Sequence, residues 1–367
     1  MGKRRIDAEG LLTVSRRLGD AAIDPAIWPE IMERISAAVG ATGALLLQSE
    51  VRTSDVPRTA SIGEVIDDYF ASGWHARDIR AARAVPLLLA GEKVVTDHDI
   101  YTPVELERSG FYNELLAKHG LKWWAVVGFQ AGAALWGLAF QRSTHQGPFE
   151  NDEKRALVPL TKRLTETATL SKAVGKAVLS GMTNALHLVS QPALALDRFG
   201  FVRDTNAAVE PILDGEINIR NRRLYLHDKR AKSLLDALVD QMRTTPDTSA
   251  LSVSPIVVQR RAKPPLVIRV LPVDGAARSP FLGVRALLLL TDLGRKSRPQ
   301  SEMLAVTFGL SPAETRLACI VASGLSTEQA AEELGITRAT ARNQLKAVFA
   351  KTDTHRQSEL VALLARL

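Results

Sequence analysis

The chain of 367 residues has a single cysteine, Cys319, so a disulfide framework is excluded and a reducing compartment is expected. Cys319 falls on the apolar side of a predicted helix, which favours a core thiol over a redox sensor. Lys3, Arg4 and Arg5 are not followed by a long apolar run, so they do not form a secretory signal. The run Ala286–Leu290 has the length of a strand, and no stretch approaches a membrane span. These absences predict a cytoplasmic protein without membrane contact.

Motifs of enzyme chemistry are also missing. The sequence has no P-loop, no dinucleotide-binding glycine pattern, no zinc spacing and no nucleophile elbow. Its seven histidines are scattered, and none lies beside an obvious nucleophile. The segment 96–99 brings three ligand types together, but no second cluster accompanies it, so a turn is favoured over a metal site. We therefore expect no catalytic residue, no metal and no cofactor.

Charge is present in modest excess. Lys and Arg number 47 against 40 Asp and Glu, and the net charge is +7. Residues 301–367 contain seven of each sign, so the excess lies before them. The excess positive charge before residue 301 either attracts nucleic acid or is dispersed over the surface.

The most informative stretch is Leu310–Val361, in which four short helices can be marked. Ser311 is a helix cap, with Pro312 at the first helical position and Glu314 completing a capping box. Gly324 ends this first helix.

The next helices follow closely. Ser326 caps the second helix and Gly335 ends it, and Thr337 caps the third. The fourth helix follows Thr354. Small residues at Ala330 and Ala331 allow the third helix to approach the second, which is the helix-turn-helix pattern.

The third helix has a polar face without any acidic residue: Arg338, Thr340, Arg342, Asn343, Lys346 and Lys351. Arg and Asn make bidentate contacts to guanine and adenine in the major groove, and Lys and Thr suit phosphates. The sequence therefore predicts a DNA-reading helix.

This segment resembles the LuxR-type (GerE-like) DNA-binding domain. The matching features are Leu310-Ser-Pro-x-Glu314, Gly324-Leu-Ser, Leu334-Gly-Ile-Thr337, Thr340-x-Arg342 and Leu345. The resemblance implies that the helix from Thr337 enters the major groove. It places Arg342 and Asn343 at base edges, and it places Thr340, Lys346 and Ser326 near phosphates, with Thr337 and Arg338 at the helix start.

The sequence departs from the family at three positions. Ala341 stands where Val is usual, which weakens one expected apolar contact to a base. Gln344 replaces a common His, and Asp353 replaces the usual Gly after the third helix.

Residues 1–150 mix helices and strands. We expect helices over 7–39 with a break at Asp24-Pro25, over 64–76 and over 106–119, and strands over 42–48, 94–96, 122–130 and 134–141. This order resembles a GAF-type sensor domain.

All five tryptophans lie in these 150 residues. Aromatic side chains either fill cores or line ligand pockets. A candidate ligand set is Tyr69, Trp74, Asp78, Trp123 and Trp136. Its Tyr69-x4-Trp74-x3-Asp78 part faintly resembles the acyl-homoserine-lactone receptors of quorum-sensing regulators.

The rest of the chain divides into four segments. Residues 151–189 predict one long connecting helix, which either forms a dimer seam or packs on its own domain, and Gly181 is a candidate break. Residues 190–293 resemble a PAS domain, with Asn206 expected to cap a helix. Residues 294–303 form a basic linker, and residues 304–367 form the helix-turn-helix domain.

We therefore expect α+β sensor domains built on antiparallel sheets, followed by an all-α domain of four helices. The function expected is that of a dimeric transcription regulator. Its expected partners are double-stranded DNA, a second copy of the chain, a small-molecule effector and RNA polymerase. The alternative is a signalling adaptor whose C-terminal helices dock a protein, and the salt dependence of DNA binding distinguishes the two.

Overall fold

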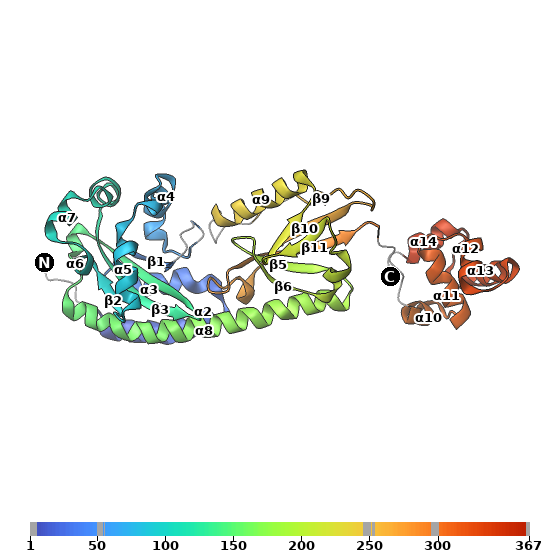
Figure 1. The fold of residues 1–367 in the computed structure, drawn as a ribbon. Coiled ribbons are helices and arrows are strands. Elements are labelled where there is room, and N and C mark those ends of the chain that lie inside the picture. Colours follow the sequence, from blue (N-terminus) through green and yellow to red (C-terminus); the bar gives the residue numbers. More distant parts are fainter. Residues whose placement is uncertain are drawn as a thin grey trace. The chain divides into compact units, whose positions relative to one another are not determined.

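The computed structural model describes residues 6–49, 54, 56–244, 251, 254–294 and 301–364. Its contacts separate the chain into two compact units. The first unit is Met1–Arg260 with Leu266–Thr291, and it contains the sheets (Figure 1). The second unit is Arg261–Pro265 with Asp292–Leu367, and it contains the C-terminal helices.

The first sheet of the first unit has four antiparallel strands: β1 (Gly43–Gln48), β2 (Val94–Thr96), β3 (Leu121–Ala131) and β4 (Ala134–Ser143). Their order is β1-β4-β3-β2. The tight turn between β3 and β4 contains Gly132, whose φ of 69° favours glycine.

Helices and short turns surround this sheet. The helices are α1 (Ala8–Arg16), α2 (Asp20–Ile23), α3 (Trp28–Ala38), α4 (Gly63–Ala71), α5 (Ile79–Leu89), α6 (Asp97–Ile100) and α7 (Pro103–Arg108). Single 3₁₀ or π turns are Arg17–Gly19, Pro25–Ile27, Ala60–Ile62, Trp74–Ala76, Phe111–Leu116, Ala117–His119 and Thr144–Gln146.

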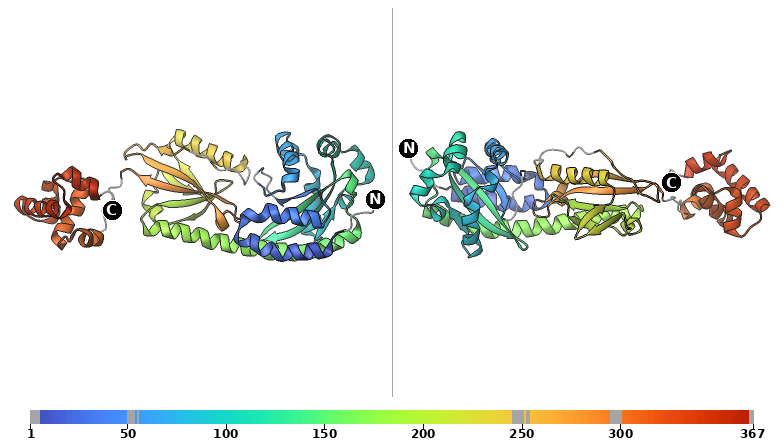
Figure 2. Two further views of the ribbon diagram at one scale, coloured as in Figure 1. Left: turned by 180° about the vertical axis from the view of Figure 1, so that it is seen from behind. Right: turned by 45° about the horizontal axis from the view of Figure 1, so that its top comes forward.

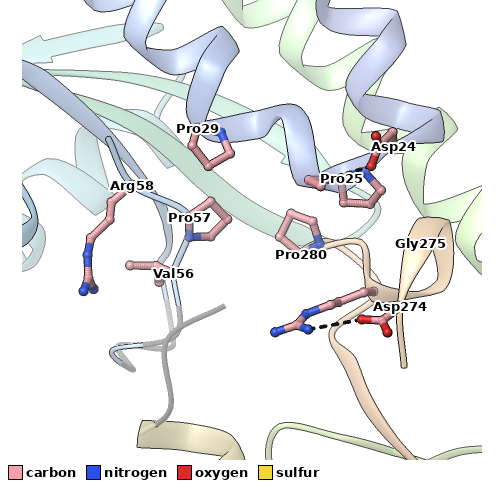
Figure 3. Close-up of a pocket in the computed structure, with 11 residues that line it drawn as sticks. Asp24, Pro25, Pro29, Val56, Pro57, Arg58, Asp274, Gly275 and Pro280 are labelled. Carbon is pink, nitrogen blue, oxygen red and sulfur yellow. Dashed lines mark hydrogen bonds and ion pairs between the residues drawn. The ribbon is translucent and has the colours of Figure 1, made fainter. Parts of the chain in front are cut away.

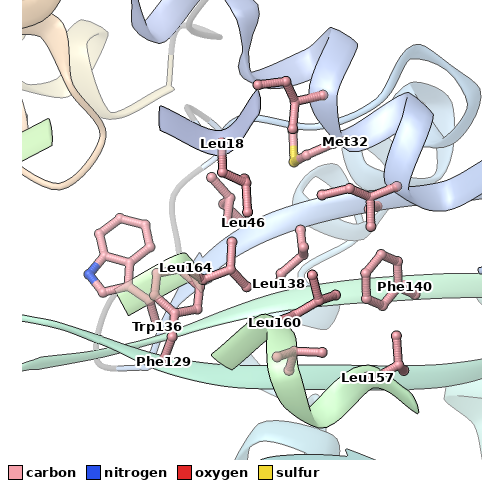
Figure 4. Packing of buried hydrophobic residues seen from close by; sticks show 14 of the residues in the cluster. Leu18, Met32, Leu46, Phe129, Trp136, Leu138, Phe140, Leu157, Leu160 and Leu164 are labelled. Atoms are coloured by element: carbon pink, nitrogen blue, oxygen red, sulfur yellow. The ribbon is translucent and has the colours of Figure 1, made fainter. Parts of the chain in front are cut away.

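Each face of the four-stranded sheet carries its own core. One face packs against α1 to α3 and the long helix α8 (Asn151–Leu188), with buried side chains such as Met32, Phe140 and Leu160 (Figure 4). The other face packs beneath α4, α5 and the segments that follow them. Strand residues alternate between the two cores because successive side chains point to opposite faces.

Two helical expectations in this region need correction. The helix expected over 106–119 is interrupted, because Ser109 has ψ 118° and ends α7 before the π turn Phe111–Leu116 begins. The helix expected over 64–76 ends at Ala71, since Gly73 adopts φ 70°. Helix α5 was not expected at all.

Helix α8 runs unbroken for 38 residues, so Gly181 does not divide it. Its start is anchored by the buried pair Arg142 and Glu153, with Nη2–Oε1 at 2.9 Å and Nη1–Oε2 at 3.1 Å. Glu153 also accepts the backbone N–H of Glu150 at 3.0 Å, which satisfies one donor at the helix start. Figures 1 and 2 show α8 passing alongside both sheets of this unit.

The second sheet of the first unit has five strands: β5 (Ala193–Asp197), β6 (Val202–Thr205), β9 (Ile256–Val258), β10 (Leu266–Pro272) and β11 (Val284–Asp292). Their order is β6-β5-β11-β10-β9. A hairpin of β7 (Ile217–Arg220) and β8 (Arg223–Leu226), helix α9 (Lys229–Thr244) and the 3₁₀ turns Ala207–Ile212 and Gly275–Arg278 complete this part. Both sheets therefore have the antiparallel character expected from the sequence.

Asn206 does not cap the turn that follows it. Its side chain instead accepts the N–H of Ala193 and donates to the carbonyls of Thr183 and Gln191. It thereby ties the end of α8 to the start of β5.

The second unit contains five helices among its described residues: α10 (Ser301–Phe308), α11 (Pro312–Ala322), α12 (Thr327–Leu334), α13 (Arg338–Thr352) and α14 (Gln357–Leu364). Four were expected, and α10 is the addition. The expected linker over 294–303 thus reaches into α10, while its residues 295–300 lie outside the described residues. Cys319 is buried in this helical core, as expected.

Across the described part of the chain, no single helix is long and apolar enough to cross a membrane. Helices α10 and α11 reach that length and composition only as a pair, bent by 117°.

Candidate functional site

The helix-turn-helix segment is held by local caps that the sequence encodes. Ser326 accepts the N–H of Gln329 at 3.2 Å, and Thr337 accepts the N–H of Thr340 at 3.1 Å. Gly335 ends α12 with φ 65°, a conformation that favours glycine. These contacts fix where α13 begins and how the chain turns into it.

Small side chains let α13 pack closely in the second unit. Ala330, Ala331 and Ala341 are buried in its core, together with Leu345 and Val348 of α13. The expectation that Ala341 weakens a contact to a base is therefore wrong, because Ala341 is fully buried and faces the core.

The opposite face of α13 is open to solvent. Of the seven side chains predicted to contact DNA, six are exposed: Thr337, Arg338, Thr340, Arg342, Asn343 and Lys346. Ser326 is half-buried, as expected of a residue that caps a helix from within the turn. Five of the predicted residues lie on α13 and Thr337 caps its start, whereas Ser326 lies at the start of α12.

Acidic groups near this face come from other helices. Arg342 Nη2 lies 3.3 Å from Glu328 Oε1 of α12, and the two side chains are 71% and 44% exposed. The backbone N–H of Glu328, followed by Arg342, holds the pKa of Glu328 below its usual value. Such an exposed pair contributes little to stability, so a nucleic acid can compete for Arg342 at small cost.

Lys351 does not belong to the free face. Its ammonium donates to Glu314 Oε2 at 2.7 Å and to the carbonyl of Gly309 at 3.0 Å. Lys351 thus joins the end of α13 to the start of α11, which removes it from the predicted reading face. Asp353, which follows, closes α13 with φ 51°, in the left-handed conformation that a glycine would adopt more easily.

A second candidate site is the cavity beneath α5 in the first unit, of about 60 Å³, which we call the α5 cavity. Its walls come from α4, α5, β1, β3 and β4, and they include Leu47, Tyr69, Asp78, Arg80, Ala81, Leu88, Trp124 and Gly137. Most of this lining is apolar, and Gly137 contributes no side chain to the floor.

Polar groups enter the α5 cavity from the start of α5. Asp78 caps the helix and accepts the N–H of Arg80 at 2.9 Å. It also pairs with the Arg80 guanidinium, with Nε–Oδ1 at 3.2 Å and Nη2–Oδ2 at 3.1 Å. The Tyr69 hydroxyl donates to Asp78 Oδ2 at 3.2 Å. Burial opposes the charge of Arg80, but Asp78 outweighs it and raises the pKa of Arg80 above its usual value.

Only part of the predicted ligand set meets at the α5 cavity. Tyr69, Asp78 and Trp136 line it, together with Arg80 and Trp124, which were not predicted. Trp136 borders the cavity but packs its ring against Phe281 in the core on the other face of the sheet, with centroids 5.0 Å apart.

The other two predicted aromatics lie elsewhere. Trp74 contacts Phe111, with centroids 5.7 Å apart, at a different surface pocket. Trp123 lies 5.7 Å from the ring of His98 and has Lys122 over its face. Grouping residues by aromatic type alone therefore mixed three separate environments.

A buried acid lies close to the α5 cavity. Asp97 accepts the hydroxyl of Tyr112, and its Oδ2 accepts the N–H of Trp124 at 2.5 Å. Burial raises the pKa of Asp97 to about 6, although these hydrogen bonds act in the opposite direction. The segment 96–99 that contains it forms α6, with a capping box between Thr96 and Asp99.

A further pocket is separate from both sites. It measures about 250 Å³ and is lined in part by Pro25, Pro29, Pro57 and Pro280 (Figure 3). Two of its charged groups are paired, since Arg58 binds Asp67 at 2.7 Å and Arg278 binds Asp274 at 3.4 Å. No group of three or more His, Cys, Asp or Glu able to hold a metal occurs in the part of the chain that the structure describes.

Comparison with protein-family models and with characterised proteins finds no match. Among solved structures, the chain is similar to the phage VqmA-DPO complex, with 16% identity and a TM-score of 0.21 over 51% of this chain and 88% of that one. It is also similar to the E. coli DhaR(N)-DhaL complex, with 12% identity and a TM-score of 0.22 over 78% of this chain and 87% of that one. At these values neither likeness bears on fold or function.

Proposed function

We propose that the chain is a sequence-specific DNA-binding transcription regulator of the LuxR type. The observation that carries this proposal is the exposed face of α13, where Arg338, Arg342 and Lys346 lie with Asn343 and no acidic residue of the same helix. The helix is 15 residues long and buries its opposite face in the unit's core. A helix with this cross-section fits the major groove of B-DNA.

The side chains divide into two roles under this proposal. Arg342 and Asn343 read base edges, because guanidinium and amide groups form paired hydrogen bonds with guanine and adenine. Lys346, Thr340 and Ser326 contact phosphates, which positions α13 without reading sequence. Arg342 exchanges its contact with Glu328 for a base, so Glu328 keeps the side chain oriented before DNA arrives.

The first unit is the sensor in this proposal, with a GAF-like and a PAS-like part joined by α8. A dimer of the chain would place two α13 helices about one helical turn of DNA apart, on a site with two-fold symmetry. RNA polymerase is then the machinery on which the bound regulator acts.

The proposal is tested by selecting binders of the full-length protein from a pool of random DNA duplexes. We expect a palindromic motif with half-sites spaced by about one helical turn. The Arg342→Ala variant should lose preference at one position of each half-site. Arg316→Ala is a matched control, because Arg316 is an exposed arginine of α11 that lies outside the α13 face. Failure of the wild type to enrich any duplex, with no salt-dependent DNA binding, would favour the protein-docking alternative.

A further inference from the structure

The tip of the β7–β8 hairpin in the first unit carries three arginines within four residues: Arg220, Arg222 and Arg223. The two strands pair so that Arg220 lies directly opposite Arg223. All three residues are exposed. Like charges that face each other across a strand pair repel, so this arrangement opposes the stability of the hairpin itself. We call these three residues the hairpin arginines.

The backbone of the turn is also unfavourable for an arginine. Asn221 and Arg222 have φ 49° and φ 60°, so both central residues of this two-residue turn are left-handed. Such a turn matches the twist of paired strands, and its usual sequence is Asn followed by Gly. Arginine at the second position is strained where glycine would not be. Strain at an exposed turn indicates that the side chain placed there has a use.

The remainder of the hairpin holds this tip in place. Its other face is buried in the core of the five-stranded sheet, through Ile217, Leu224 and Leu226. Arg223 Nη1 donates to the carbonyl of Phe199 at 2.8 Å, which anchors the first residue of β8. The Cζ of Arg220 lies 5.2 Å from the ring centre of Tyr225, so the aromatic face supports this guanidinium. The tip is therefore a fixed support for exposed positive charge.

Within the described residues, no carboxylate neutralises Arg220 or Arg222. Neither side chain forms an ion pair or a hydrogen bond there. Arg203 of β6 differs from them, because its Nη2 lies 2.6 Å from Asp197 Oδ2. The guanidinium groups of Arg220 and Arg222 thus keep their donors available for an anion from outside the chain.

The chemistry of the tip favours the phosphates of duplex DNA. A guanidinium binds phosphate through two parallel hydrogen bonds. Residues 301–367, which include α13, contain seven Lys and Arg and seven Asp and Glu, so this segment has little net attraction for DNA. Added attraction must then come from elsewhere in the chain. A membrane surface suits the tip less well, because residues 220–223 include no large apolar side chain that could insert into it.

We infer that the hairpin arginines form a second DNA contact, which binds backbone phosphates of the duplex without reading base sequence. This inference rests on the proposed function, since α13 selects the site and the hairpin adds affinity to it. Contact with phosphates also offsets the repulsion between Arg220 and Arg223, because each guanidinium then faces an anion.

The test measures how binding of the full-length protein to a random-sequence duplex depends on salt. The double variant Arg220→Gln/Arg222→Gln removes two of the charges and keeps Arg223, which supports the hairpin. Each lost phosphate contact should lower the slope of log K against log salt by about 0.9, so the slope should fall by about 2 for each bound chain. At about 0.1 M salt the affinity should fall about ten-fold or more. The base preference found by duplex selection should not change.

Matched variants separate the position of the charge from its amount. Arg16→Gln/Arg155→Gln removes the same net charge from two exposed arginines of α1 and α8, so its salt slope should equal that of the wild type. Arg220→Lys/Arg222→Lys keeps the charge at the tip and should recover most of the affinity, because lysine also binds phosphate. Urea unfolding should show no loss of stability in the glutamine variant, since its change relieves the repulsion across the hairpin.

Three results would overturn the inference. The first is an unchanged salt slope in the glutamine variant, and the second is an equal loss in the Arg16→Gln/Arg155→Gln control, which would assign the effect to net charge. The third is weaker binding of that variant to phosphatidylglycerol vesicles with unchanged DNA binding, which would assign the tip to a membrane surface.

The proposed reading face is tested separately on the same duplexes. If Arg342→Ala keeps the base preference while the glutamine variant loses affinity, the placement of the reading face is wrong and the hairpin contact stands. If Arg342→Ala loses preference while the glutamine variant binds as the wild type does, only the hairpin contact is wrong.

Discussion

At the residue scale, the exposed cations of α13 differ in what they should contribute to DNA binding. Arg342→Ala should cost about 1–3 kcal/mol of binding to the preferred duplex and relax preference at one base pair, because a bidentate contact is lost. Lys346→Ala should weaken binding to all duplexes alike and reduce the slope of log K against log salt by about 1. Titrations with matched and scrambled duplexes at several salt concentrations measure both effects. A normal operator affinity for Arg342→Ala would mean that the reading face is placed wrongly.

Asp97 should make the stability of the first unit depend on pH. Its pKa rises from an ordinary 3.8 to about 6 on folding, because burial disfavours the charged form. Between these values the folded chain keeps a proton that the unfolded chain releases. The contribution of Asp97 is therefore present at low pH, falls as pH rises through this window, and stays lost above pH 6.

The variant Asp97→Asn removes this dependence. From pH 4 to pH 7 the free energy of unfolding of the wild type should fall by about 1–3 kcal/mol relative to the variant. Urea unfolding followed by tryptophan fluorescence measures it, since all five tryptophans lie in the first unit. Asp68→Asn is the control. Lys118, His119 and Ser72 lower the pKa of Asp68, so the contribution of Asp68 to the free energy of unfolding changes only below pH 4. A pH-independent difference for Asp97→Asn would contradict the assignment.

Single residues also show which contacts could be predicted from the sequence and which could not. The caps Ser311, Ser326 and Thr337 are local signals, and each makes its expected contact. Trp136 borders the α5 cavity, while the two-residue period of β4 turns its ring into the core opposite Gly137. The partner of Lys351 is 37 residues away, so only the fold reveals it.

At the scale of elements, replacing either of two glycines of α8 by alanine should change the stability of the first unit, in opposite directions for the two positions. A Cβ on Gly175 would lie 2.6 Å from the carbonyl oxygen of Ala276. This oxygen belongs to the backbone, so it cannot easily move away. A Cβ on Gly181 would meet nothing within 4 Å. Gly175→Ala should therefore destabilise the first unit by about 1–3 kcal/mol.

Gly181→Ala should stabilise the same unit by about 0.5–1 kcal/mol, because alanine restricts the unfolded chain and suits a helix interior. The two variants are each other's control in urea unfolding. A loss of stability in Gly181→Ala would indicate that α8 does bend at this position in solution.

Some helices and strands could be predicted from their own sequence, and others could not. Helix α8 was expected because its apolar residues recur at steps of three and four, and the hairpin β3–β4 because two apolar runs flank a glycine turn. The interruption at Ser109 depends on packing of Phe111 and Tyr112 against Tyr101 and Tyr69, which no local pattern shows. Helix α5 was missed although Asp78 is a good cap, because Pro86 lies inside it.

At the scale of the whole molecule, the exposed apolar flank of α8 bears on the predicted dimer. Leu170, Val178 and Met182 are 49%, 37% and 36% exposed, and their spacing keeps them along one side of the helix. Val178→Glu combined with Met182→Glu should convert a dimer to a monomer, because charges would be buried in the seam. Lys176→Glu, on the same helix outside this flank, is the control.

Sedimentation at micromolar concentration measures the mass of each variant. A wild type that already sediments as a monomer would contradict the seam, as would a double variant that remains dimeric. Palindromic enrichment with a monomeric wild type would instead place dimer formation on the DNA itself.

The broad architecture was the part best predicted: antiparallel sheets with helices first, then a helical C-terminal segment. Which residues share a cavity was predicted poorly, because that depends on contacts between segments far apart in the chain. Arg80 illustrates the point, since its isolated sequence position gives no sign that Phe111 and Trp124 enclose it.

The anchoring of α8 at both ends has a mechanical consequence. Arg142 and Glu153 fasten its first turns to the four-stranded sheet, and Asn206 binds Thr183 near its last turn to the five-stranded sheet. A flexible linker would bend when either sheet moved slightly, and it would not pass the movement on. A hydrogen-bonded rod of 38 residues, about 57 Å long at roughly 1.5 Å per residue, transmits rotation along its axis instead. A ligand that tilts β4 by a few degrees would therefore also rotate the far end of α8. The helix would pass that rotation from the four-stranded sheet to the five-stranded sheet.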